Sequence, residues 1–381
     1  MRNLNNIDKL FKSKTKEVTF LELKNQAVVD INGYKLKGGL PLPVITDNLI
    51  KDIQYSDLSE EIKLGQIIEG IIFLLGVDPE FPHMDQYKEI LFKYDSKILD
   101  FIFYRGMKAL EAGEYENSGV FFRAVIELDP NNLNARLNYA LVLESIGKNL
   151  IESEKFDEGK EFLIGSTNEM EDIINIDDSY SLAYYKLGYH YKYFDQYLKA
   201  KITWNKFLIL DKDENRLQEI REQIDLIEDD VKMEVGLSYL DYNYFDKALD
   251  SFLKLMPKYK DNWNINYLIG LCFKGMKDYE LAIDYFNNAI ELNDEEADIY
   301  NELGIIYFVQ GNILDAVNIF DKGIKKINDD YKLYFNRGLG YMQLGDNKLA
   351  LKDIIKANEL NPYDENVAMQ KEELEKLLKN S

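Results

Sequence analysis

The sequence contains little cysteine and little proline. Among its 381 residues there is one cysteine, Cys272, and there are seven prolines. A single thiol rules out an internal disulfide framework and fits a reducing compartment. We therefore expect a cytoplasmic protein whose stability comes from side-chain packing. Its richness in Lys, Asn, Ile and Tyr suggests an AT-rich bacterial genome.

Long apolar runs are also absent. The longest, residues 70–77, is far shorter than the roughly 20 residues that a membrane-spanning helix needs. No apolar segment of signal-peptide length occurs at the start of the chain, which reads MRNLNNIDKLFKSKTKEVTF. We expect neither a membrane span nor a secretion signal.

Positive charge is scarce relative to negative charge. The chain has 46 Lys and Arg against 68 Asp and Glu, a formal charge of −22. Such a chain repels phosphates and anionic lipids, so we expect no nucleic-acid partner and regard membrane binding as disfavoured. Residues 1–40 differ, with eight basic against four acidic residues. We interpret the basic start as a frayed N-terminal arm, with a membrane-surface helix as the alternative.

Residues that carry catalysis or bind cofactors form no known pattern. The two histidines, His83 and His190, are far apart, and the aromatic helical context of His190 favours a packed or solvated side chain. No phosphate-binding glycine loop occurs. Residues 211–222 place acidic side chains at several positions of a calcium loop, but Arg216 stands where that loop needs glycine. We interpret this stretch as a polar loop with helix-capping acids, and expect no metal, no cofactor and no enzyme.

A repeat is what the sequence does contain. A small residue recurs at regular spacing, usually three positions before an aromatic residue or leucine. These anchors are Gly106, Ala140, Gly188, Gly236, Gly270, Gly304 and Gly338. Successive anchors lie 34, 48, 48, 34, 34 and 34 residues apart, so two intervals exceed the others by 14. Self-similarity at such a period is typical of helical repeat proteins.

Each repeat predicts a pair of antiparallel helices. Small and apolar residues fall on one helical face, as Tyr300, Leu303, Gly304 and Tyr307 show, and a second stripe leads to Phe320. Glycine inside a helix costs about 1 kcal/mol relative to alanine, so its recurrence indicates that two helices must approach closely. A lone hairpin cannot bury both faces, and neighbouring hairpins are therefore expected to stack.

These units resemble the tetratricopeptide repeat family, whose pattern combines Leu-Gly, Tyr, Ala, Phe, Ala and Pro. In one unit the matching residues are Gly270, Phe273, Tyr279, Ala282, Phe286 and Ala289. The resemblance covers residues 99–364 in seven units. It implies an all-α fold, a right-handed α-solenoid of helical hairpins, with a small mixed α/β N-terminal segment. Departures include Ser118 where the family has Ala, and Arg105 and Arg337 where it has Leu.

The two additions of 14 residues, near 149–162 and 215–228, are expected to lengthen helices. Fourteen residues are close to four helical turns at about 3.6 residues per turn, so the apolar stripe stays nearly in register. We expect one long helix near 153–176 and another near 215–241.

The two ends of the chain lie outside the repeat. Residues 1–57 are predicted to form a small non-repeat segment, because Asn32-Gly33 between alternating residues indicates a β-hairpin. Residues 58–98 are predicted to be a helical lead-in, and residues 365–381 an amphipathic capping helix. The lead-in helices are expected at about 58–75 and 84–96.

The resemblance also implies where a partner would bind. In that family, ligands lie in a concave groove lined by the first helix of each hairpin, at positions offset from the packing stripe. Carried onto this chain, those positions are apolar and aromatic. The candidate partner-binding residues are Tyr185, Tyr189, Tyr193, Tyr267, Leu271, Asn301, Ile305, Phe308, Phe335 and Leu339. The Lys and Asn arrangement with which some members hold a peptide's terminal carboxylate is incomplete, which disfavours chaperone-tail binding.

Tyr185, Tyr189 and Tyr193 repeat every four residues and are predicted to form one ridge. These rings either pack against the long helices or form a hot spot for a partner. Both interpretations stay open at the level of sequence.

Three functions can be weighed from these patterns. The first is a non-enzymatic scaffold that holds a protein or peptide in an apolar, aromatic groove. The alternative is a ligand-sensing regulator whose N-terminal segment acts on an effector or membrane. An enzyme housed in residues 1–98 is least favoured, since that region has one histidine and no recognisable site. The sequence identifies neither the partner nor the oligomeric state.

Overall fold

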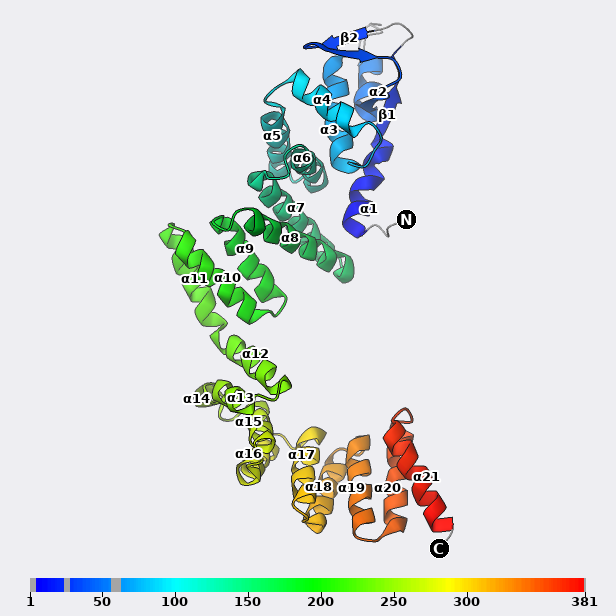
Figure 1. The fold of residues 1–381 in the computed structure, drawn as a ribbon, viewed down its shortest axis with the longest axis vertical. Helices are drawn as coiled ribbons and strands as arrows, with labels where there is room; N and C mark the ends of the chain where they lie inside the picture. The colour runs from blue at the N-terminus through cyan, green and yellow to red at the C-terminus, as the bar shows by residue number, and fades with distance from the viewer. Residues whose placement is uncertain (1–4, 24–27, 56–62, 380–381) are drawn as a thin grey trace. The chain divides into compact units, whose positions relative to one another are not determined.

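The computed structural model of the protein is a series of stacked helical hairpins preceded by a small segment that contains strands (Figure 1). It describes residues 5–23, 28–55 and 63–379. The chain divides between Glu222 and Gln223 into two compact units, called here the N-terminal unit and the C-terminal unit. The expected mostly helical array with a small N-terminal β segment is confirmed.

The N-terminal segment combines helices with two antiparallel strand pairs. Its elements are α1 (Asn6–Ser13), the 3₁₀ turn η1 (Lys14–Glu17), β1 (Val18–Leu21), β2 (Val28–Ile31), β3 (Tyr34–Lys37), β4 (Leu42–Ile45) and α2 (Thr46–Tyr55). β1 pairs with β4, and β2 pairs with β3. The β2–β3 turn is the predicted one: Asn32 and Gly33 have φ of 48° and 90°, and a two-residue hairpin turn of this kind requires positive φ at both positions.

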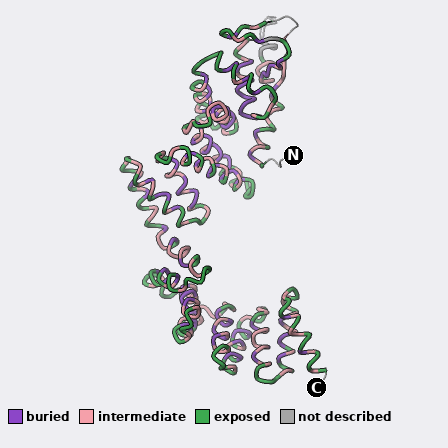
Figure 2. The backbone as a smooth tube through the Cα atoms, viewed as in Figure 1, coloured by how far each residue is buried: buried purple, intermediate pink, exposed green. Residues whose placement is uncertain are grey.

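Two helices, α3 (Leu64–Val77) and α4 (Met84–Tyr94), connect this segment to the hairpins. α3 is buried along most of its length, because β4 covers one side and α6 (Tyr115–Leu128) the other (Figure 2). Its contacts are close: a Cβ on Gly70 would lie 2.0 Å from the carbonyl oxygen of Pro43. No helix in the described ranges is both long enough and apolar enough to cross a membrane. The helix start expected at 58–62 lies outside the described residues, and α2 was not expected.

Three helical hairpins and one additional helix complete the N-terminal unit. The hairpins are α5 (Ile98–Glu111) with α6, α7 (Leu133–Glu152) with α8 (Phe156–Ile176), and α9 (Ser181–Tyr193) with α10 (Tyr197–Leu210). The additional helix α11 (Glu214–Leu226) follows, and the boundary between the two units falls within it.

The C-terminal unit continues with further hairpins and ends in a single helix. Its elements are α12 (Glu228–Asp241), α13 (Phe245–Leu253), α14 (Met256–Tyr259), α15 (Trp263–Gly275), α16 (Tyr279–Leu292), α17 (Ala297–Val309), α18 (Ile313–Lys326), α19 (Tyr331–Gln343), α20 (Asn347–Leu360) and α21 (Glu365–Lys379). α21 packs on α20, where Val367 and Leu374 join the last apolar cluster.

The recurring glycine makes room for an aromatic ring on the paired helix. A Cβ on Gly304 of α17 would come 2.3 Å from Cε1 of Phe320 on α18, and one on Gly270 would come 2.7 Å from Cε1 of Phe286. The ring occupies the space that a side chain on the first helix would fill, so the spacing reflects packing. Ser118, where the repeat pattern has alanine, is buried and donates a hydrogen bond to the carbonyl of Gly106 at 2.9 Å.

We predict that Gly304→Ala destabilises the C-terminal unit by about 1–3 kcal/mol, because the added methyl overpacks the Phe320 ring. Gly65→Ala is the matched control, since nothing lies within 4 Å of its Cβ position in α3. There the substitution is expected to be neutral or to stabilise by up to about 1 kcal/mol through helix propensity. Urea denaturation followed by circular dichroism measures both, and equal effects would contradict a steric role for Gly304.

The first addition is shared by both helices of one hairpin. α7 and α8 have 20 and 21 residues, whereas α5 and α6 have 14 each. The structure thus places a long helix at 156–176, within the expected 153–176, but the preceding helix is also lengthened. Because antiparallel partners must match in length to bury each other, adding to one helix alone would leave its apolar stripe uncovered.

The expectation of one long helix near 215–241 is wrong. α11 ends at Leu226 and α12 begins at Glu228, and Ile227 between them has φ −97° and ψ 3°. Ile220 in α11, Ile227 at the break and Val231 in α12 are all buried, so the apolar stripe is kept although the helix is interrupted.

The basic start of the chain is a docked helix and not the frayed arm that we expected. Phe11 of α1 is fully buried, and a Cβ on Gly119 of α6 would lie 2.7 Å from its ring. Ile7 lies over Gly165 of α8, where a Cβ would come 2.4 Å from Ile7 Cδ1. The i, i+4 spacing of Ile7 and Phe11 gives α1 one apolar face, and two glycines on α6 and α8 provide a slot that accepts it.

Candidate functional site

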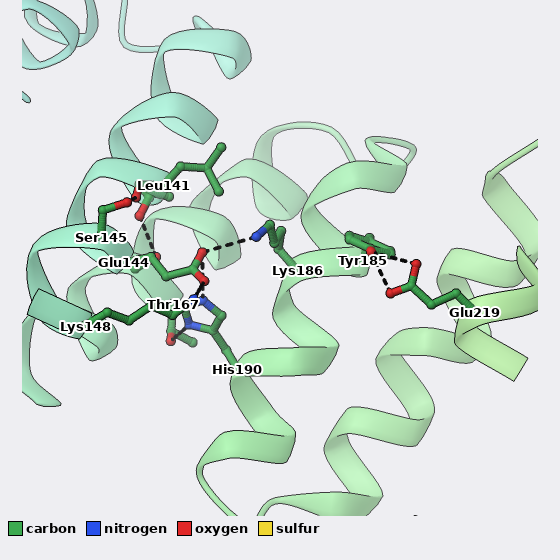
Figure 3. A network of polar contacts seen from close by, with 11 residues as sticks. Leu141, Glu144, Ser145, Lys148, Thr167, Tyr185, Lys186, His190 and Glu219 are labelled. Atoms are coloured by element: carbon green, nitrogen blue, oxygen red, sulfur yellow. Dashed lines mark hydrogen bonds and ion pairs between the residues drawn. The ribbon is translucent and has the colours of Figure 1, made fainter. Parts of the chain in front are cut away.

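The three tyrosines of α9 differ in their surroundings. Tyr185 donates hydrogen bonds to the carboxylate of Glu219 on α11, at 2.9 and 3.0 Å (Figure 3), and Tyr189 donates to the same carboxylate. Their rings also pack on aromatic side chains of α10: Tyr185 lies 5.4 Å from Phe207, and Tyr189 lies 5.1 Å from Trp204, centroid to centroid. Tyr185 and Tyr189 are therefore largely engaged within the fold.

The bond to Glu219 makes both phenols poor acids. Burial raises the pKa of Tyr185, and the hydrogen bond and negative charge of Glu219 raise it further. The same causes, with burial again the largest, raise the pKa of Tyr189. Both hydroxyls are hydrogen-bond donors that hold α11 against α9.

Tyr193, one turn further along α9, is exposed and lines a pocket. Its side chain is 57% exposed, and its ring lies edge-on to Phe194. The pocket has a volume of about 270 Å³ and lies between α7, α8 and the C-terminal half of α9. Its apolar wall consists of Ile151, Leu163, Tyr189 and Tyr193. Ile151 lies in the last turn of α7, beyond the length of the other first helices, so the lengthened hairpin helps to form this pocket.

Glu144 of α7 is the centre of the polar side of the pocket (Figure 3). Its carboxylate lies 3.3 Å from Nζ of Lys186 and 3.8 Å from Nε2 of His190, and it also pairs with Lys148 on its own helix. Burial alone would raise the pKa of Glu144, but these three neighbours lower it far below the ordinary value. The group is a carboxylate at any physiological pH, and its charge is largely neutralised.

His190 is buried and oriented by two elements. It is 6% exposed, and its Nδ1 lies 2.9 Å from Oγ1 of Thr167 on α8. Along the chain the nearest carboxylate to His190 is that of Asp195, five residues away and beyond the end of α9, whereas the fold brings Glu144 to His190 from α7. This partner was missed because the two residues are 46 positions apart, and only the Glu144–Lys148 spacing of four residues was visible in advance.

In the C-terminal unit the candidate positions are half-buried between adjacent hairpins. Tyr267 packs on Phe286 with centroids 5.8 Å apart, and Leu271 joins the same apolar clusters. The remaining half-buried candidates are Ile305 and Phe308 on α17 and Phe335 and Leu339 on α19. These side chains still present part of their surface to solvent, as a binding surface requires.

Asn301 is an exception among these candidates. It is 4% exposed, its Nδ2 lies 3.3 Å from Oδ1 of Asp330, and its Oδ1 accepts a hydrogen bond from Asn336 at 3.0 Å. Asn301 thus joins α17 to α19, and its amide is already satisfied within the fold. We assign it to the packing of hairpins and leave it out of the proposed binding surface.

The calcium-like stretch acts as a helix cap in the structure. Asp213 accepts hydrogen bonds from the backbone amides of Asn215 and Arg216 at the start of α11. Asp211 pairs with Arg216 at 2.9 Å and accepts from Ser181. Burial alone would raise the pKa of Asp211, but these hydrogen bonds lower it. No group of three or more potential metal ligands occurs among the described residues.

A family comparison matches two segments of the chain. The tetratricopeptide repeat model matches residues 264–296 and 331–364, which contain α15–α16 and α19–α20. These two hairpins are therefore similar to tetratricopeptide repeats, and they are two of the seven units expected from the sequence.

Two curated relatives match over a limited stretch. The BBSome complex member BBS4 of Bos taurus is 31% identical over 98 residues, which cover 26% of this chain and 19% of that protein. Serine/threonine-protein phosphatase 5 of Homo sapiens is 30% identical over 110 residues, 27% of this chain and 21% of that protein. The chain thus spans about a fifth of the length of the curated relatives that it matches.

Solved structures also align with parts of the chain. YrrB, described as a TPR protein with an unusual peptide-binding site, aligns with a TM-score of 0.27 at 17% identity, over 66% of this chain and 97% of that chain. MamA AMB-1 aligns with a TM-score of 0.35 at 20% identity, over 51% of this chain and 98% of that chain.

Proposed function

We propose that this chain, which carries tetratricopeptide repeats, is a non-enzymatic scaffold that binds a protein or peptide segment on the first helices of its hairpins. The observation that supports this proposal is the pocket at the end of α9. It places an exposed tyrosine, Tyr193, beside a fixed charge cluster around Glu144. A large aromatic ring with solvent access next to prearranged polar groups is typical of a protein-binding hot spot.

The size of the pocket suits one side chain of a partner. A volume of about 270 Å³ lies just below the roughly 300–1,000 Å³ of small-molecule sites. Its apolar wall would take an aliphatic or aromatic anchor, while Lys148, 61% exposed at the rim, is placed to contact a flanking carboxylate.

The charge around the pocket favours an acidic partner. Residues 181–210, which form the α9–α10 hairpin, contain five lysines and one acidic residue, whereas the whole chain has a formal charge of −22. Acidic segments are thus repelled by most of the protein and attracted to this hairpin. We expect the bound segment to combine an apolar anchor with neighbouring Asp or Glu.

A random peptide library selected on the wild-type protein tests this function directly. Peptides enriched on the wild type are expected to lose about thirtyfold or more in affinity for Tyr193→Ala, because a hot-spot truncation costs about 2 kcal/mol. Calorimetry measures the affinity. The melting temperature should stay nearly constant, since Tyr193 is exposed.

Tyr242→Ala is the matched control, because Tyr242 is 73% exposed and belongs to the C-terminal unit. It should leave the affinity unchanged, whereas Lys148→Glu should weaken acidic peptides specifically. Peptides that bind Tyr193→Ala as tightly as the wild type would contradict the assignment of the pocket.

A ligand-sensing regulator is the second candidate, and one observation favours it. The N-terminal segment is packed on the hairpins through Phe11 and Ile7, so a change at those hairpins can reach it. Deleting residues 1–57 cannot separate the two functions, because it would also remove buried β4 residues that cover α3. Point substitutions in α1 are the appropriate test.

A further inference from the structure

A cavity separate from the α9 pocket lies under α1. Its volume is about 320 Å³, and α1, α3, α6, α7 and α8 all contribute residues to it. We call it the α1 cavity. It is large enough for a small metabolite and lies at the lower end of the range for ligand sites, roughly 300–1,000 Å³. None of its lining residues lines the α9 pocket, so the two sites are separate.

A buried arginine is fixed in the wall of the α1 cavity. Nε of Arg123 on α6 donates to the carbonyl of Gly76 at 2.8 Å, and Nη1 donates to the hydroxyl of Tyr139 at 3.1 Å. The guanidinium also lies over the ring of Phe11, 4.6 Å from its centroid. Three contacts from three elements hold this cation in one position, with its side chain only 17% exposed.

The ion pair of Arg123 is a long one. Oδ1 of Asp8 on α1 lies 3.6 Å from Nη1 of Arg123, which is longer than a direct hydrogen bond. Burial alone would lower the pKa of Arg123, but Tyr139 and Asp8 raise it, so the charge is retained. Leaving a buried cation this loosely paired is costly, and an anionic ligand group would offset that cost.

Tyr139 adds a second donor on the same side. Its side chain is 5% exposed, and burial raises its pKa to about 12, so the phenol is neutral. Because its oxygen accepts from Arg123, its own proton is available for an oxygen atom in the cavity. Arg123 and Tyr139 together form a site for a carboxylate.

Acidic groups line the cavity as well. They are Asp8, Glu127 of α6 and Glu169 of α8, of which Glu127 also pairs with Lys88 at 2.6 Å and Glu169 with Arg136 at 2.7 Å. Burial raises the pKa of Glu169, and Arg136 opposes that shift. A ligand with negative charge alone would be repelled by these carboxylates, and one with positive charge alone by Arg123.

Part of the remaining lining is apolar, while Asn5 and Asn168 add polar side chains. Ile7 of α1, Leu75 of α3, Ile126 of α6 and Leu143 of α7 all face the cavity. An aliphatic group of the ligand would be removed from water there, and each buried methylene would stabilise the complex by about 0.8 kcal/mol. The cavity therefore favours a ligand with an uncharged, branched side chain.

We propose that the α1 cavity binds a free aliphatic α-amino acid. Its carboxylate contacts Arg123 and Tyr139, and its ammonium group lies toward Asp8 and Glu169. Its side chain lies among the apolar residues of α3, α6 and α7. A zwitterion offers a partner both to the cation and to the carboxylates of the cavity.

Binding would also stabilise the docked position of α1. Asn5, Ile7 and Asp8 line the cavity, so part of its wall is the N-terminal helix itself. α1 is also held to α8 by Asn6, whose backbone and side-chain amides donate hydrogen bonds to the carboxylate of Glu161 at 2.7 and 2.6 Å. A ligand that contacts both Asp8 and Arg123 adds a link between α1 and α6 to their own ion pair, and it reduces undocking of α1.

The test uses the full-length wild-type protein and three matched probes. L-leucine, its decarboxylated analogue isoamylamine and its deaminated analogue isocaproate are each titrated by calorimetry and by thermal denaturation. L-Leucine is expected to raise the melting temperature to a saturating value. L-Valine and L-methionine are titrated in parallel, and at least one of the three amino acids should show this effect. Each analogue should bind about tenfold to hundredfold more weakly than its parent, since it lacks one charge-assisted contact.

Two variants assign the effect to the α1 cavity. Asp8→Asn should weaken amino acid binding about tenfold or more by removing the partner of the ammonium group. Asp78→Asn is the control. It removes the 3.3 Å ion pair that Asp78 makes with Lys12 of α1, but Asp78 does not line the cavity, so binding should persist. Ile126→Phe, which fills the cavity without touching a charge, should abolish binding.

Cleavage by trypsin gives a second readout. Lys9 and Lys12 lie in α1, so a ligand that holds the helix in place should slow cleavage there in the wild type and not in Asp8→Asn. The proposal is overturned if none of the aliphatic amino acids binds in the millimolar range, if isocaproate binds as tightly as leucine, or if Asp8→Asn and Ile126→Phe bind like the wild type.

Discussion

Arg337→Leu is expected to destabilise the C-terminal unit by about 3–5 kcal/mol, although leucine is the residue that the repeat pattern has at this position. Arg337 of α19 makes a two-point contact with Asp353 of α20, at 2.7 and 2.8 Å, and a third with Asp321 of α18 at 2.7 Å. Asp353 is 4% exposed. Removing the guanidinium would leave a buried carboxylate without a cation, and the charge accounts for most of the loss.

The double variant Arg337→Leu/Asp353→Ala separates charge from packing. Replacing both members of a buried pair by apolar residues is often close to neutral, so the double variant should recover most of the stability lost in the single one. Urea denaturation gives the overall change, and hydrogen exchange of α18, α19 and α20 locates it, because repeat arrays can unfold in parts. A double variant as unstable as Arg337→Leu would contradict this explanation.

Phe11→Ala is expected to cost about 3–5 kcal/mol in the N-terminal unit, as large core truncations do. The ring is fully buried against Gly119, lies 6.0 Å from Tyr139 and is covered by Arg123. Because Gly119 has no side chain, removing the ring leaves a gap between α1 and α6. Undocking of α1 should follow, and limited trypsin digestion should then cleave at the lysines of residues 9–16 much faster than in the wild type.

Phe156→Ala is the matched control for Phe11→Ala. Phe156 is 63% exposed at the start of α8, so its truncation should change the free energy of unfolding by less than about 0.5 kcal/mol. Similar losses for the two variants, or an unchanged rate of cleavage in Phe11→Ala, would mean that α1 is a peripheral arm after all.

The hairpin pattern could be derived from the sequence because its causes are local. The spacing of Gly304 and Phe320 follows from helix geometry, and each hairpin repeats it with small changes. The turn at Asn32-Gly33 was predictable for a similar reason, since few residues accept positive φ at two successive positions. In both cases the information lies within one hairpin.

The site was only partly predictable. The four-residue spacing of Tyr185, Tyr189 and Tyr193 places them on one face of α9, but their environments differ because of residues far away in the chain. Glu219 on α11 engages the first two, while the end of α7 leaves the third beside a pocket. Side-chain spacing indicates which face a residue occupies, and the neighbouring helix decides whether that face is covered.

The sequence by itself determined the helical class, the hairpin repeat and its small-to-large packing, because 3.6-residue periodicity and steric fit act within about 34 residues. Only the tertiary structure decided that the first addition is divided between α7 and α8, that the second stretch breaks at Ile227, and that α1 docks on Gly119 and Gly165. It also brought Glu144 to His190 and Arg123 to Tyr139. These contacts depend on which helices meet, and a local pattern carries no information about its distant partner.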